Sequence, residues 1–409
     1  MDLLSNYPYW PMKDGLPASY PPLKQDIRCE VAVIGAGITG ALIAWYLAEA
    51  GIETVVLDRR EVAHGSTSGS TSLLQYEIDQ PLFKLQQCLG VDRANRAYHG
   101  CLDAIHDLGR LVKKLKLDCG FEYKGSLLLA SERSHLARLL HEYEARRSAG
   151  FKVDWWSRSA VKKKSSLSQP AAILSTTNEA AQVDAFALTY GLLAAAVKRG
   201  TRVFDQTAVI RQKRNSRGIE LTTSRGSRVQ AKWLVVASGY EANQFLPEQV
   251  TTLHSTFAIA SEPVEKFTGW PDGLPVIWET ADPYIYLRTT ADCRIIMGGY
   301  DEPFRDPARR DRLLNAKAGL LMRRFRQLFP RIPFELTTAW AGTFGKTKDG
   351  LPFIGEYKDI PRTWFALGYG GNGITYSMIA AQMFRDRLKG RPLKDADLYG
   401  FERRPDATV

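Results

Sequence analysis

The segment from Cys29 to Leu57 constrains the fold more strongly than any other part of this sequence. It contains an apolar run, CEVAVIG, then the motif GAGITG at 35–40, and a second apolar run, ETVVL, at 53–57. Apolar residues at helical spacing fill 38–50 between the two runs, and Gly51 suits the position after a helix end. Short β-branched runs joined by a helix predict parallel strands with a right-handed crossover. The chain is therefore expected to begin as an α/β unit with a parallel sheet.

The glycine motif lies in the full context of a dinucleotide-binding turn. Gly35 permits the tight turn after the strand, Gly37 lets the backbone approach a pyrophosphate, and Gly40 lets the helix pack closely on the strand. The helix that starts here presents its N-terminus to that anionic group. Asp58 ends the next apolar run, where a carboxylate accepts hydrogen bonds from ribose hydroxyls. We therefore expect a bound dinucleotide.

The following loop favours a flavin dinucleotide over a nicotinamide one. Arg59-Arg60 is followed by GSTSGSTSLL at 65–74, and such a small, hydroxyl-rich loop can wrap phosphate and ribityl oxygens. A nicotinamide-binding unit would more often continue directly to another helix. A flexible surface linker has the same composition, so that alternative stays open. Two later segments fit the flavin interpretation: LVVASG at 234–239, and GYGGNGIT at 368–375, which precedes a helix whose N-terminus could stabilise a reduced, anionic flavin ring.

Composition and charge exclude several other classes of protein. The net charge of +11 is spread along the chain, which indicates a solvated basic face rather than a nucleic-acid-binding surface. The 5 cysteines contain no CxxC pair, and the histidines have no ligand spacing, so neither a disulfide framework nor a metal site is expected. The N-terminus lacks a signal-peptide pattern, and Glu49 and Glu53 interrupt the longest apolar stretch. We expect a cytoplasmic protein without a membrane span.

The remaining periodicities predict a mixture of helices and strands. Helices are expected at 84–117, 134–149, 183–199 with Asp184 as N-cap, 307–329 and 374–389. Strands are expected at 126–130, 201–209, 218–222, 227–236, 351–355 and 363–368, with strand-like alternation over 250–300. Residues 1–28, rich in Pro, Tyr and Trp, are expected to form an extended arm on the surface.

Taken together, these motifs resemble one known group of enzymes. VAVIGAGITG, the Ser/Thr loop, VVASG, TKDGLPFIG and ALGYGGNGIT occur in the order found in FAD-dependent amine and amino-acid oxidoreductases of the D-amino-acid oxidase superfamily. Glycine oxidase, sarcosine oxidase and γ-glutamylputrescine oxidase are members. The resemblance runs from about residue 7 to 395 and implies a Rossmann-like FAD-binding domain, α/β in class, interleaved with an α+β substrate domain built on an antiparallel sheet. The implied segments are an arm at 1–28, FAD-binding segments at 29–90, 165–245 and 336–409, and substrate-domain segments at 91–164 and 246–335.

The resemblance also implies which residues contact FAD. They are Gly35, Ala36, Gly37, Ile38, Thr39, Gly40, Asp58, Arg59, Ser66, Thr67, Ser68, Ser70, Leu73, Ala208, Val209, Ala237, Gly239, Gly371, Asn372, Gly373, Ile374 and Thr375. Some relatives tether FAD to a cysteine near the TKDG segment or to a histidine in the first loop. Here no cysteine follows Cys293, and His64 precedes the loop, so we expect non-covalent FAD.

The departures from the family pattern concern the substrate. Glycine oxidases carry a carboxylate-binding arginine at the position of Phe344, and a second family arginine falls at Gly371. The lysine of monomeric sarcosine oxidases falls at Thr375. Because phenylalanine cannot replace the bidentate fork of arginine, an amine is a better substrate for this chain than a simple α-amino acid. The oxygen-activating lysine of the family falls at Ile296, which leaves both an oxidase and a dehydrogenase open.

Six residues are candidates for the substrate site: Trp278, Tyr284, Tyr286, Arg288, Phe344 and Tyr369. The five aromatic residues could form a wall around an alkylamine, although each could equally be a core residue. Arg288 shares one strand face with Tyr284 and Tyr286, and is the candidate to hold a distal carboxylate.

The resemblance implies hydride transfer from the substrate carbon to flavin N5, giving an imine that hydrolyses. The expected substrate is an alkylamine or a γ-glutamyl-polyamine-like compound, and the expected acceptor is O2 or another oxidant. Two alternatives remain: an oxidase of glycine, sarcosine or D-amino acids, and a flavin-binding protein without turnover. The sequence does not identify the amine, the oxidant or the oligomeric state.

Overall fold

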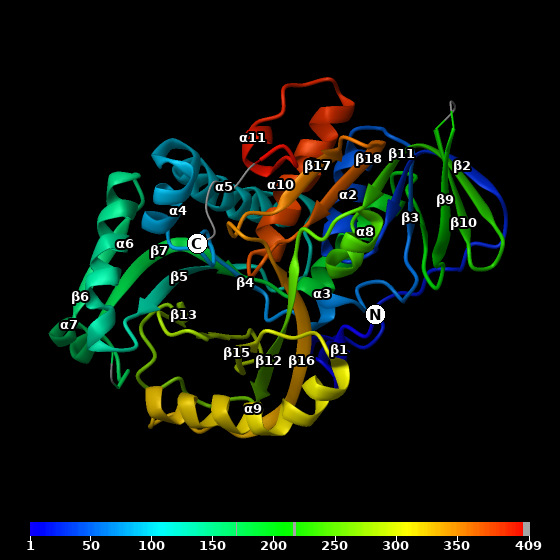
Figure 1. The fold of residues 1–409 in the computed structure, drawn as a ribbon. Coiled ribbons are helices and arrows are strands. Elements are labelled where there is room, and N and C mark those ends of the chain that lie inside the picture. The colour runs from blue at the N-terminus through cyan, green and yellow to red at the C-terminus, as the bar shows by residue number, and fades with distance from the viewer. Residues whose placement is uncertain (169, 216–217, 404–409) are drawn as a thin grey trace.

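Two β-sheets, one mainly parallel and one mainly antiparallel, carry the other elements of the chain (Figure 1). The computed structural model describes residues 1–168, 170–215 and 218–403. Residues 169, 216–217 and 404–409 of the implied FAD-binding segments lie outside this description. The expected combination of an α/β part and an α+β part is confirmed.

The first sheet has the strand order β17-β18-β11-β2-β3-β8, with β10 paired to β11 and β9 paired to β10. Its strands are β2 (Ile27–Ile34), β3 (Thr54–Leu57), β8 (Arg202–Phe204), β9 (Val209–Asn215), β10 (Gly218–Thr223), β11 (Arg228–Val236), β17 (Phe353–Tyr357) and β18 (Ile360–Leu367). The central pairs, from β18 to β8, are parallel. The single strand expected at 201–209 is two strands, because the chain turns at Gln206, whose φ is 44°.

Helices cover one face of the first sheet. They are α2 (Ile38–Glu49), α8 (Ala185–Val197) and α10 (Gly373–Leu388). Val31, Val33 and Val56 from the sheet share one buried core with these helices, whereas Ala32 and Val55 point to a second core on the opposite face. This alternation explains why the strands read as continuous apolar runs.

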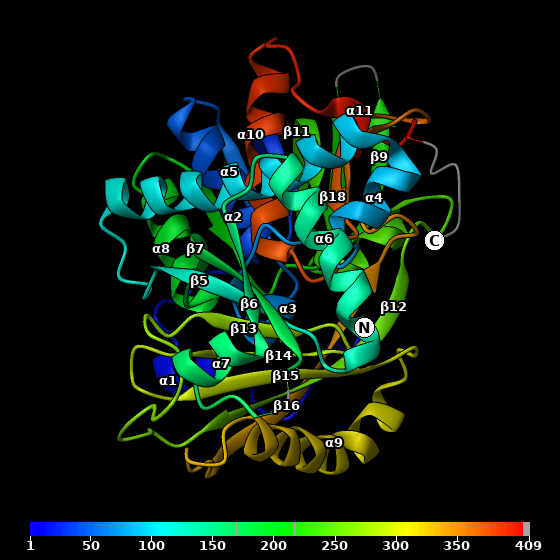
Figure 2. The same cartoon turned by 90° about the vertical axis from the view of Figure 1, so that its left-hand side faces the viewer.

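The second sheet has the order β1-β16-β12-β15-β14-β13-β5-β7-β4, with β6 paired to β7. Its strands are β1 (Leu4–Ser5), β4 (Leu73–Leu74), β5 (Glu122–Leu129), β6 (Val153–Ser157), β7 (Ala172–Gln182), β12 (Thr252–Ser261), β13 (Val276–Glu279), β14 (Ile285–Thr289), β15 (Ile295–Glu302) and β16 (Leu336–Lys346). Only β13 and β5 run parallel among the paired strands described. Helix α9 (Pro307–Leu328) covers one face of this sheet, below β15 and β16 in Figure 2.

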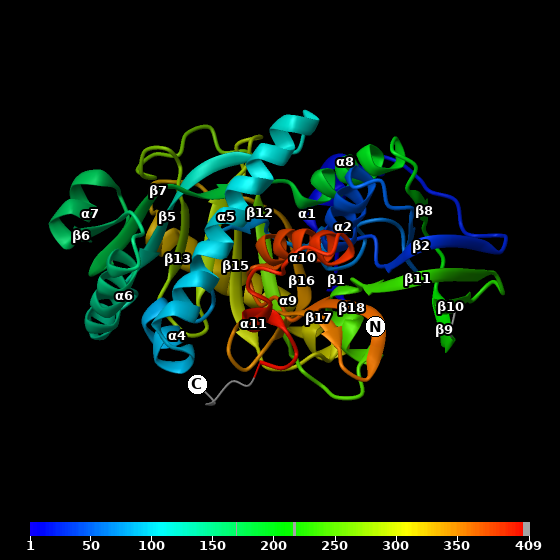
Figure 3. The same ribbon diagram turned by 90° about the horizontal axis from the view of Figure 1, so that it is seen from above.

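The sheets do not follow the implied segment boundaries. Strands β7 and β16 belong to the second sheet, although 165–245 and 336–409 were assigned to the FAD-binding domain. Helix α5 (Val91–Leu115) falls in the implied substrate segment 91–164 but packs against α10. Figure 3 shows α5 crossing the junction between the two sheets beside α10.

Glycine and capping residues set several helix boundaries. The helix expected at 84–117 is two helices, α4 (Leu82–Leu89) and α5, because Gly90 adopts a φ of 82° between them. Asp184 caps α8 as expected, since its carboxylate accepts hydrogen bonds from the N–H groups of Phe186 and Ala187 at 3.0 and 2.9 Å. The other short helices are α3 (Ser66–Gly69), α6 (Leu136–Ser148), α7 (Arg158–Lys164), α11 (Ala396–Tyr399) and the 3-10 turns η1 (Arg133–His135) and η2 (Gly239–Phe245). In the described ranges, no helix combines the length and apolar character required to cross a membrane.

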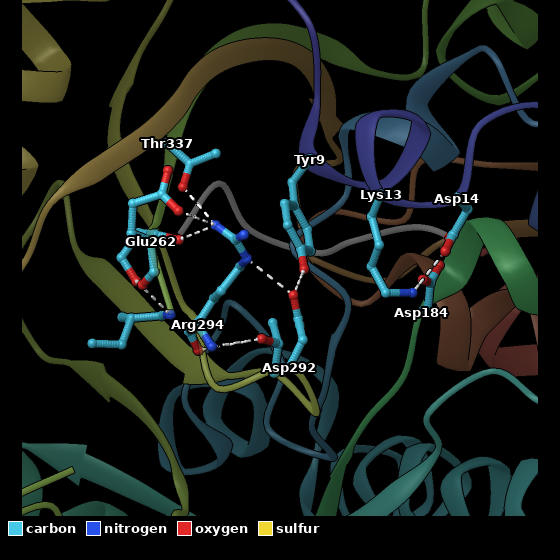
Figure 4. A network of polar contacts seen from close by, with 11 residues as sticks. Tyr9, Lys13, Asp14, Asp184, Glu262, Asp292, Arg294 and Thr337 are labelled. Carbon is cyan, nitrogen blue, oxygen red and sulfur yellow. Dashed lines mark hydrogen bonds and ion pairs between the residues drawn. The ribbon is translucent and has the colours of Figure 1, made fainter. Parts of the chain in front are cut away.

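The N-terminal segment is only partly the surface arm that its composition suggests. Residues 15–26 form no helix or strand and are mostly exposed, whereas residues 4–14 contain β1 and the helix α1 (Tyr9–Asp14), and Trp10 is only 2% exposed. Figure 4 shows how α1 is held: the Tyr9 hydroxyl donates to Asp292 at 2.5 Å, and Lys13 pairs with Asp184 at 3.0 Å. Arg294 continues this network to Asp292. The arm prediction was wrong for this part because the side chains of Tyr9 and Trp10 are buried by contacts distant in sequence.

Candidate functional site

A cavity of about 650 Å³ lies where the parallel strands of the first sheet end. The residues at or just after the carboxyl ends of β2, β3, β11 and β18 line one side of it, namely Ile34, Gly35, Leu57, Asp58, Ala237, Ser238, Leu367 and Gly368. Residues of the second sheet line the other side. Ligands of open α/β sheets bind at this edge, and the volume lies in the range of small-molecule sites, about 300–1,000 Å³.

Most residues expected to contact FAD line this cavity. They are Gly35, Gly37, Ile38, Thr39, Asp58, Arg59, Ser66, Thr67, Ser70, Leu73, Ala208, Val209, Ala237, Gly239, Gly371, Asn372, Gly373 and Ile374.

The four other expected contact residues do not line the cavity but contact the residues and turns that do. Ala36 donates its N–H to the Asp58 carboxylate at 2.7 Å, and Gly40 packs against the Gly35 carbonyl. The hydroxyls of Ser68 and Thr375 donate to backbone carbonyls within their own turns. Direct contact of these residues with FAD stays a prediction.

The lining fits a flavin dinucleotide. The buried hydroxyl oxygens of Ser66 and Ser238 have no hydrogen-bond partner within the described chain, and both residues line the cavity. A side chain at Gly37 would place its Cβ 2.9 Å from the Thr67 hydroxyl, at the turn where a pyrophosphate approaches the helix N-terminus. Free polar atoms beside a close-approach glycine form a suitable environment for phosphate and ribityl oxygens.

The Asp58 carboxylate is fixed by the backbone at the adenosine end of this lining. It accepts hydrogen bonds from the N–H groups of Ala36 and Arg60, at 2.7 and 2.8 Å, and burial raises its pKa. Glu241 pairs with Arg60 at 3.0 Å and with Arg59. Asp58 thus keeps acceptor capacity for ribose hydroxyls, while the arginines beside it are neutralised.

The opposite end of the cavity is aromatic, as expected. Trp278, Tyr284, Tyr286, Phe344 and Tyr369 all line it. The ring of Tyr284 lies edge-on to Trp278, with centroids 6.2 Å apart, and 5.9 Å from the ring of Tyr286. No sequence signal indicated Tyr240, which also lines the cavity and lies in η2, shortly after the end of β11.

Arg288 does not line the cavity, which contradicts its assignment as a substrate anchor. Its side chain is 2% exposed, and its guanidinium donates to the carbonyls of Ser72 and Val183 at 2.7 Å each. It also donates to the carbonyls of Thr71 and Thr289 at 3.4 and 3.0 Å. Burial lowers the pKa of Arg288 to about 10. The guanidinium therefore holds the end of the Ser/Thr loop rather than facing a ligand.

Two carboxylates that no sequence motif indicated face the aromatic end. Asp79 accepts hydrogen bonds from the Tyr284 hydroxyl at 2.9 Å and from the Gly371 N–H at 3.1 Å. Asp301, at the end of β15, has one buried carboxylate oxygen without a partner in the described chain, and burial raises its pKa to about 6. Neither carboxylate has an ion-pair partner among the residues described.

Asp79 is held in place by the glycine-rich turn. The Asn372 amide donates to the carbonyls of Gln75 and Glu77 at 2.9 Å each, which ties the segment 75–79 to that turn. A Cβ at Gly371 would lie 3.0 Å from an Asp79 carboxylate oxygen. Asp79 thus fills the space that a side chain at Gly371 would occupy, where the family pattern has an arginine.

Among the described residues, the cationic side chains that line the cavity lie at the end next to Asp58. The cationic residues in the described lining are Arg59, Arg60 and Arg211, which lie beside Asp58 or follow Val209. At the aromatic end, Lys346 lies outside the lining, with its ammonium 5.3 Å from the centre of the Phe344 ring. The aromatic end of the cavity is therefore lined by carboxylates and by no cationic side chain of the described residues.

The two positions considered for oxygen activation and for covalent attachment of FAD, Ile296 and His64, are not part of the described lining. Ile296 is fully buried in β15, and His64 is absent from the lining, with its Nδ1 2.9 Å from the Val62 carbonyl oxygen. Non-covalent attachment of FAD remains a prediction.

Comparison with known proteins extends this geometry. Residues 30–387 match the family model described as FAD dependent oxidoreductase, abbreviated DAO. The chain is 24% identical over 388 residues to γ-glutamylputrescine oxidoreductase of Escherichia coli K12, covering 91% of this chain and 86% of that protein. It is 26% identical over 392 residues to glycine oxidase of Bacillus licheniformis, covering 92% and 97%. The crystal structure of glycine oxidase from Geobacillus kaustophilus superposes with a TM-score of 0.77 at 21% identity, covering 92% of this chain and 99% of that one.

The family match spans most of the chain, and the cavity fits the cofactor for which the family is described. This chain therefore belongs to the DAO family of FAD-dependent oxidoreductases.

Proposed function

We propose that the protein oxidises the carbon–nitrogen bond of an alkylamine or a polyamine-like compound rather than that of an α-amino acid. The observation that carries this proposal is the charge of the aromatic end of the cavity. Asp79 and Asp301 face it, and the described lining there contains no arginine, lysine or histidine. A carboxylate on the reacting carbon would meet like charge, whereas an ammonium would be attracted to the carboxylates and aromatic faces.

Bound FAD supplies the chemistry by accepting a hydride from the carbon next to nitrogen. The residues of the chain bind and orient the amine. Asp79 is positioned by Tyr284 and Gly371 to hold an ammonium, and the aromatic wall excludes water from the alkyl chain. Asp301, with its pKa raised to about 6 by burial, can take a proton as the ammonium becomes the neutral amine that reacts. The resulting imine is hydrolysed by water.

Anaerobic mixing of the purified holoprotein with a panel of compounds tests this proposal. The panel contains alkylamines, polyamines, γ-glutamyl polyamines, N-methyl amino acids, glycine and D-amino acids. We expect the flavin absorbance to bleach with amines only. Bleaching only with α-amino acids would contradict the proposal, and bleaching with none would favour a flavin-binding protein without turnover. Readmitting air to the reduced protein then separates an oxidase from a dehydrogenase.

The variant Asp79→Asn tests the residue that distinguishes this site. Asparagine preserves the size of the side chain and an acceptor for the Tyr284 hydroxyl but removes the charge. We expect the KM for the best amine to rise by about 10- to 100-fold, since hydrogen bonds to charged groups contribute about 1.5–3 kcal/mol. Asp272→Asn, at an exposed position, is the matched control. Equal KM values for Asp79→Asn and the control would contradict the role of Asp79.

One observation favours the alternative of an amino-acid oxidase. Lys346 lies close to Phe344, at the edge of the site, and could reach a substrate carboxylate by a change of its side-chain conformation. In that case Lys346→Met would raise the KM of an α-amino acid selectively. Under the amine proposal the same variant leaves the KM of amines unchanged or lowers it.

A further inference from the structure

A second, smaller cavity adjoins the main one at its aromatic end. Its volume is about 50 Å³, and it shares Asp79, Trp278 and Tyr284 with the main cavity. Its other lining residues come from α6 (Leu136–Ser148), from the start of α4, from β5, and from the end of β13 and the segment after it. The Tyr284 hydroxyl, hydrogen-bonded to Asp79 at 2.9 Å, forms part of the wall between the two spaces. The small cavity is therefore placed to receive the far end of a ligand in the main one.

The acidic residues of the small cavity are already neutralised, apart from Asp79. Glu142 pairs with Arg146 at 2.7 Å, and its other oxygen accepts the Phe83 N–H at 3.2 Å. Glu279 pairs with Arg324 at 2.6 Å. These carboxylates hold the walls of the cavity together and offer little attraction to a second cation.

Two hydrogen-bond donors remain without partners in this cavity. Arg138, one turn before Glu142 on α6, lines it and has no hydrogen bond or ion pair within the described chain. The buried indole N–H of Trp278, which lines both cavities, also has no acceptor in the described residues. The buried Trp278 N–H is costly to leave without an acceptor, and the half-buried Arg138 adds a positive charge beside it. Together they favour a ligand group that supplies acceptor oxygens.

We propose that the small cavity is a distal subsite that binds a carboxylate at the far end of the substrate. This inference rests on the proposed amine oxidation, because it places the reacting amine in the main cavity. Asp79 lies between the two spaces and repels a carboxylate from the junction, whereas Arg138 and the Trp278 N–H attract one beyond it. The site thus suits an amine whose alkyl chain ends in a carboxylate. A carboxylate at the reacting carbon does not fit this arrangement.

Two substrates of matched length test the subsite. n-Hexylamine and 6-aminohexanoate differ only in that a carboxylate replaces the terminal methyl group. With the wild-type holoprotein we expect both to reduce the flavin anaerobically, and 6-aminohexanoate to have the lower KM. In Arg138→Ala the KM for 6-aminohexanoate should rise at least about tenfold, the loss expected for one charge-assisted hydrogen bond. The KM for n-hexylamine should stay unchanged and serves as the internal control for folding.

Two further measurements separate binding from structural effects. Arg138→Lys, which keeps the charge, should recover part of the lost affinity for 6-aminohexanoate. Hexanoate, which cannot be oxidised at nitrogen, should perturb the flavin absorbance spectrum of the wild-type protein and have a weaker Kd in Arg138→Ala. An equal change of both KM values in Arg138→Ala, or no change in either, would overturn the distal subsite while leaving the amine proposal intact. Failure of both amines to reduce the wild-type flavin would instead overturn the proposed function and the subsite with it.

Discussion

Replacement of Arg288 by methionine should weaken retention of FAD rather than recognition of the substrate. The guanidinium donates two hydrogen bonds of 2.7 Å, to the carbonyls of Ser72 and Val183, in a site that is 2% exposed. Hydrogen bonds to charged groups contribute about 1.5–3 kcal/mol each, so loss of these two costs about 3–6 kcal/mol. Methionine fills a similar space beside Trp10 but leaves the Val183 carbonyl without a donor and the Ser72 carbonyl with only the long 3.4 Å hydrogen bond from the Val183 N–H.

That free energy is a large part of the stability of an ordinary domain, about 5–15 kcal/mol. Because Ser72 ends the Ser/Thr loop that lines the cofactor cavity, the loss should loosen this loop first. We expect a lower Tm and a faster release of FAD, followed by the rise of free-flavin fluorescence after dilution. The exposed Arg305→Met is the control variant. Unchanged Tm and FAD release, together with a higher KM for the substrate, would refute this account and restore Arg288 as a substrate anchor.

Three other predictions follow from the site and its support. n-Hexylguanidinium stays cationic at every pH used, and its binding should weaken as the pH falls through about 6, because Asp301 then becomes protonated. The variant Asp301→Asn should bind it equally across that pH range. If the variant keeps the pH dependence of the wild-type protein, Asp301 is not the group that binds the cation. Gly37→Val should purify with little FAD, since its Cβ would lie 2.9 Å from the Thr67 hydroxyl at the expected pyrophosphate turn, and a normal flavin absorbance at 450 nm would contradict this. Arg403→Met should cost about 3–5 kcal/mol in urea unfolding because it leaves Asp349, 2% exposed, without its cation, and Asp349→Asn in the same chain should recover part of this cost.

The elements around the cofactor cavity were predictable because their signals are local. The glycine motif, the apolar runs and the helical spacing at 38–50 each act within a few residues, and the structure places β2, α2 and β3 there. The split at Gly90 was not predicted because apolar residues recur at helical spacing on both sides of it, and a single glycine inside such a pattern is often tolerated within one helix. The burial of Trp10 depends on contacts with segments more than fifty residues away, as its indole N–H donates to the Ser70 carbonyl at 2.6 Å.

The aromatic end of the cavity was only partly predictable, because it is built by contacts between segments that lie far apart in the sequence. Strand alternation correctly placed Tyr284 and Tyr286 together, but it could not show that backbone carbonyls of the Ser/Thr loop cover Arg288 on the same face. Asp79 lies in no motif, and its position depends on Asn372, almost three hundred residues later. The absence of the family arginines at Phe344 and Gly371 is the sequence feature that led to the proposed change of substrate. The carboxylate that fills the space at Gly371 became visible only in the fold.

Anaerobic reduction of the wild-type flavin by one matched pair of compounds tests the central claim most directly. n-Hexylamine and 2-aminoheptanoate share the same amine and chain, and the second carries a carboxylate on the carbon to be oxidised. The acidic, aromatic end of the cavity predicts that n-hexylamine bleaches the flavin and that neither enantiomer of 2-aminoheptanoate does so at the same concentration. Faster bleaching by either enantiomer of 2-aminoheptanoate would contradict the proposed charge selectivity.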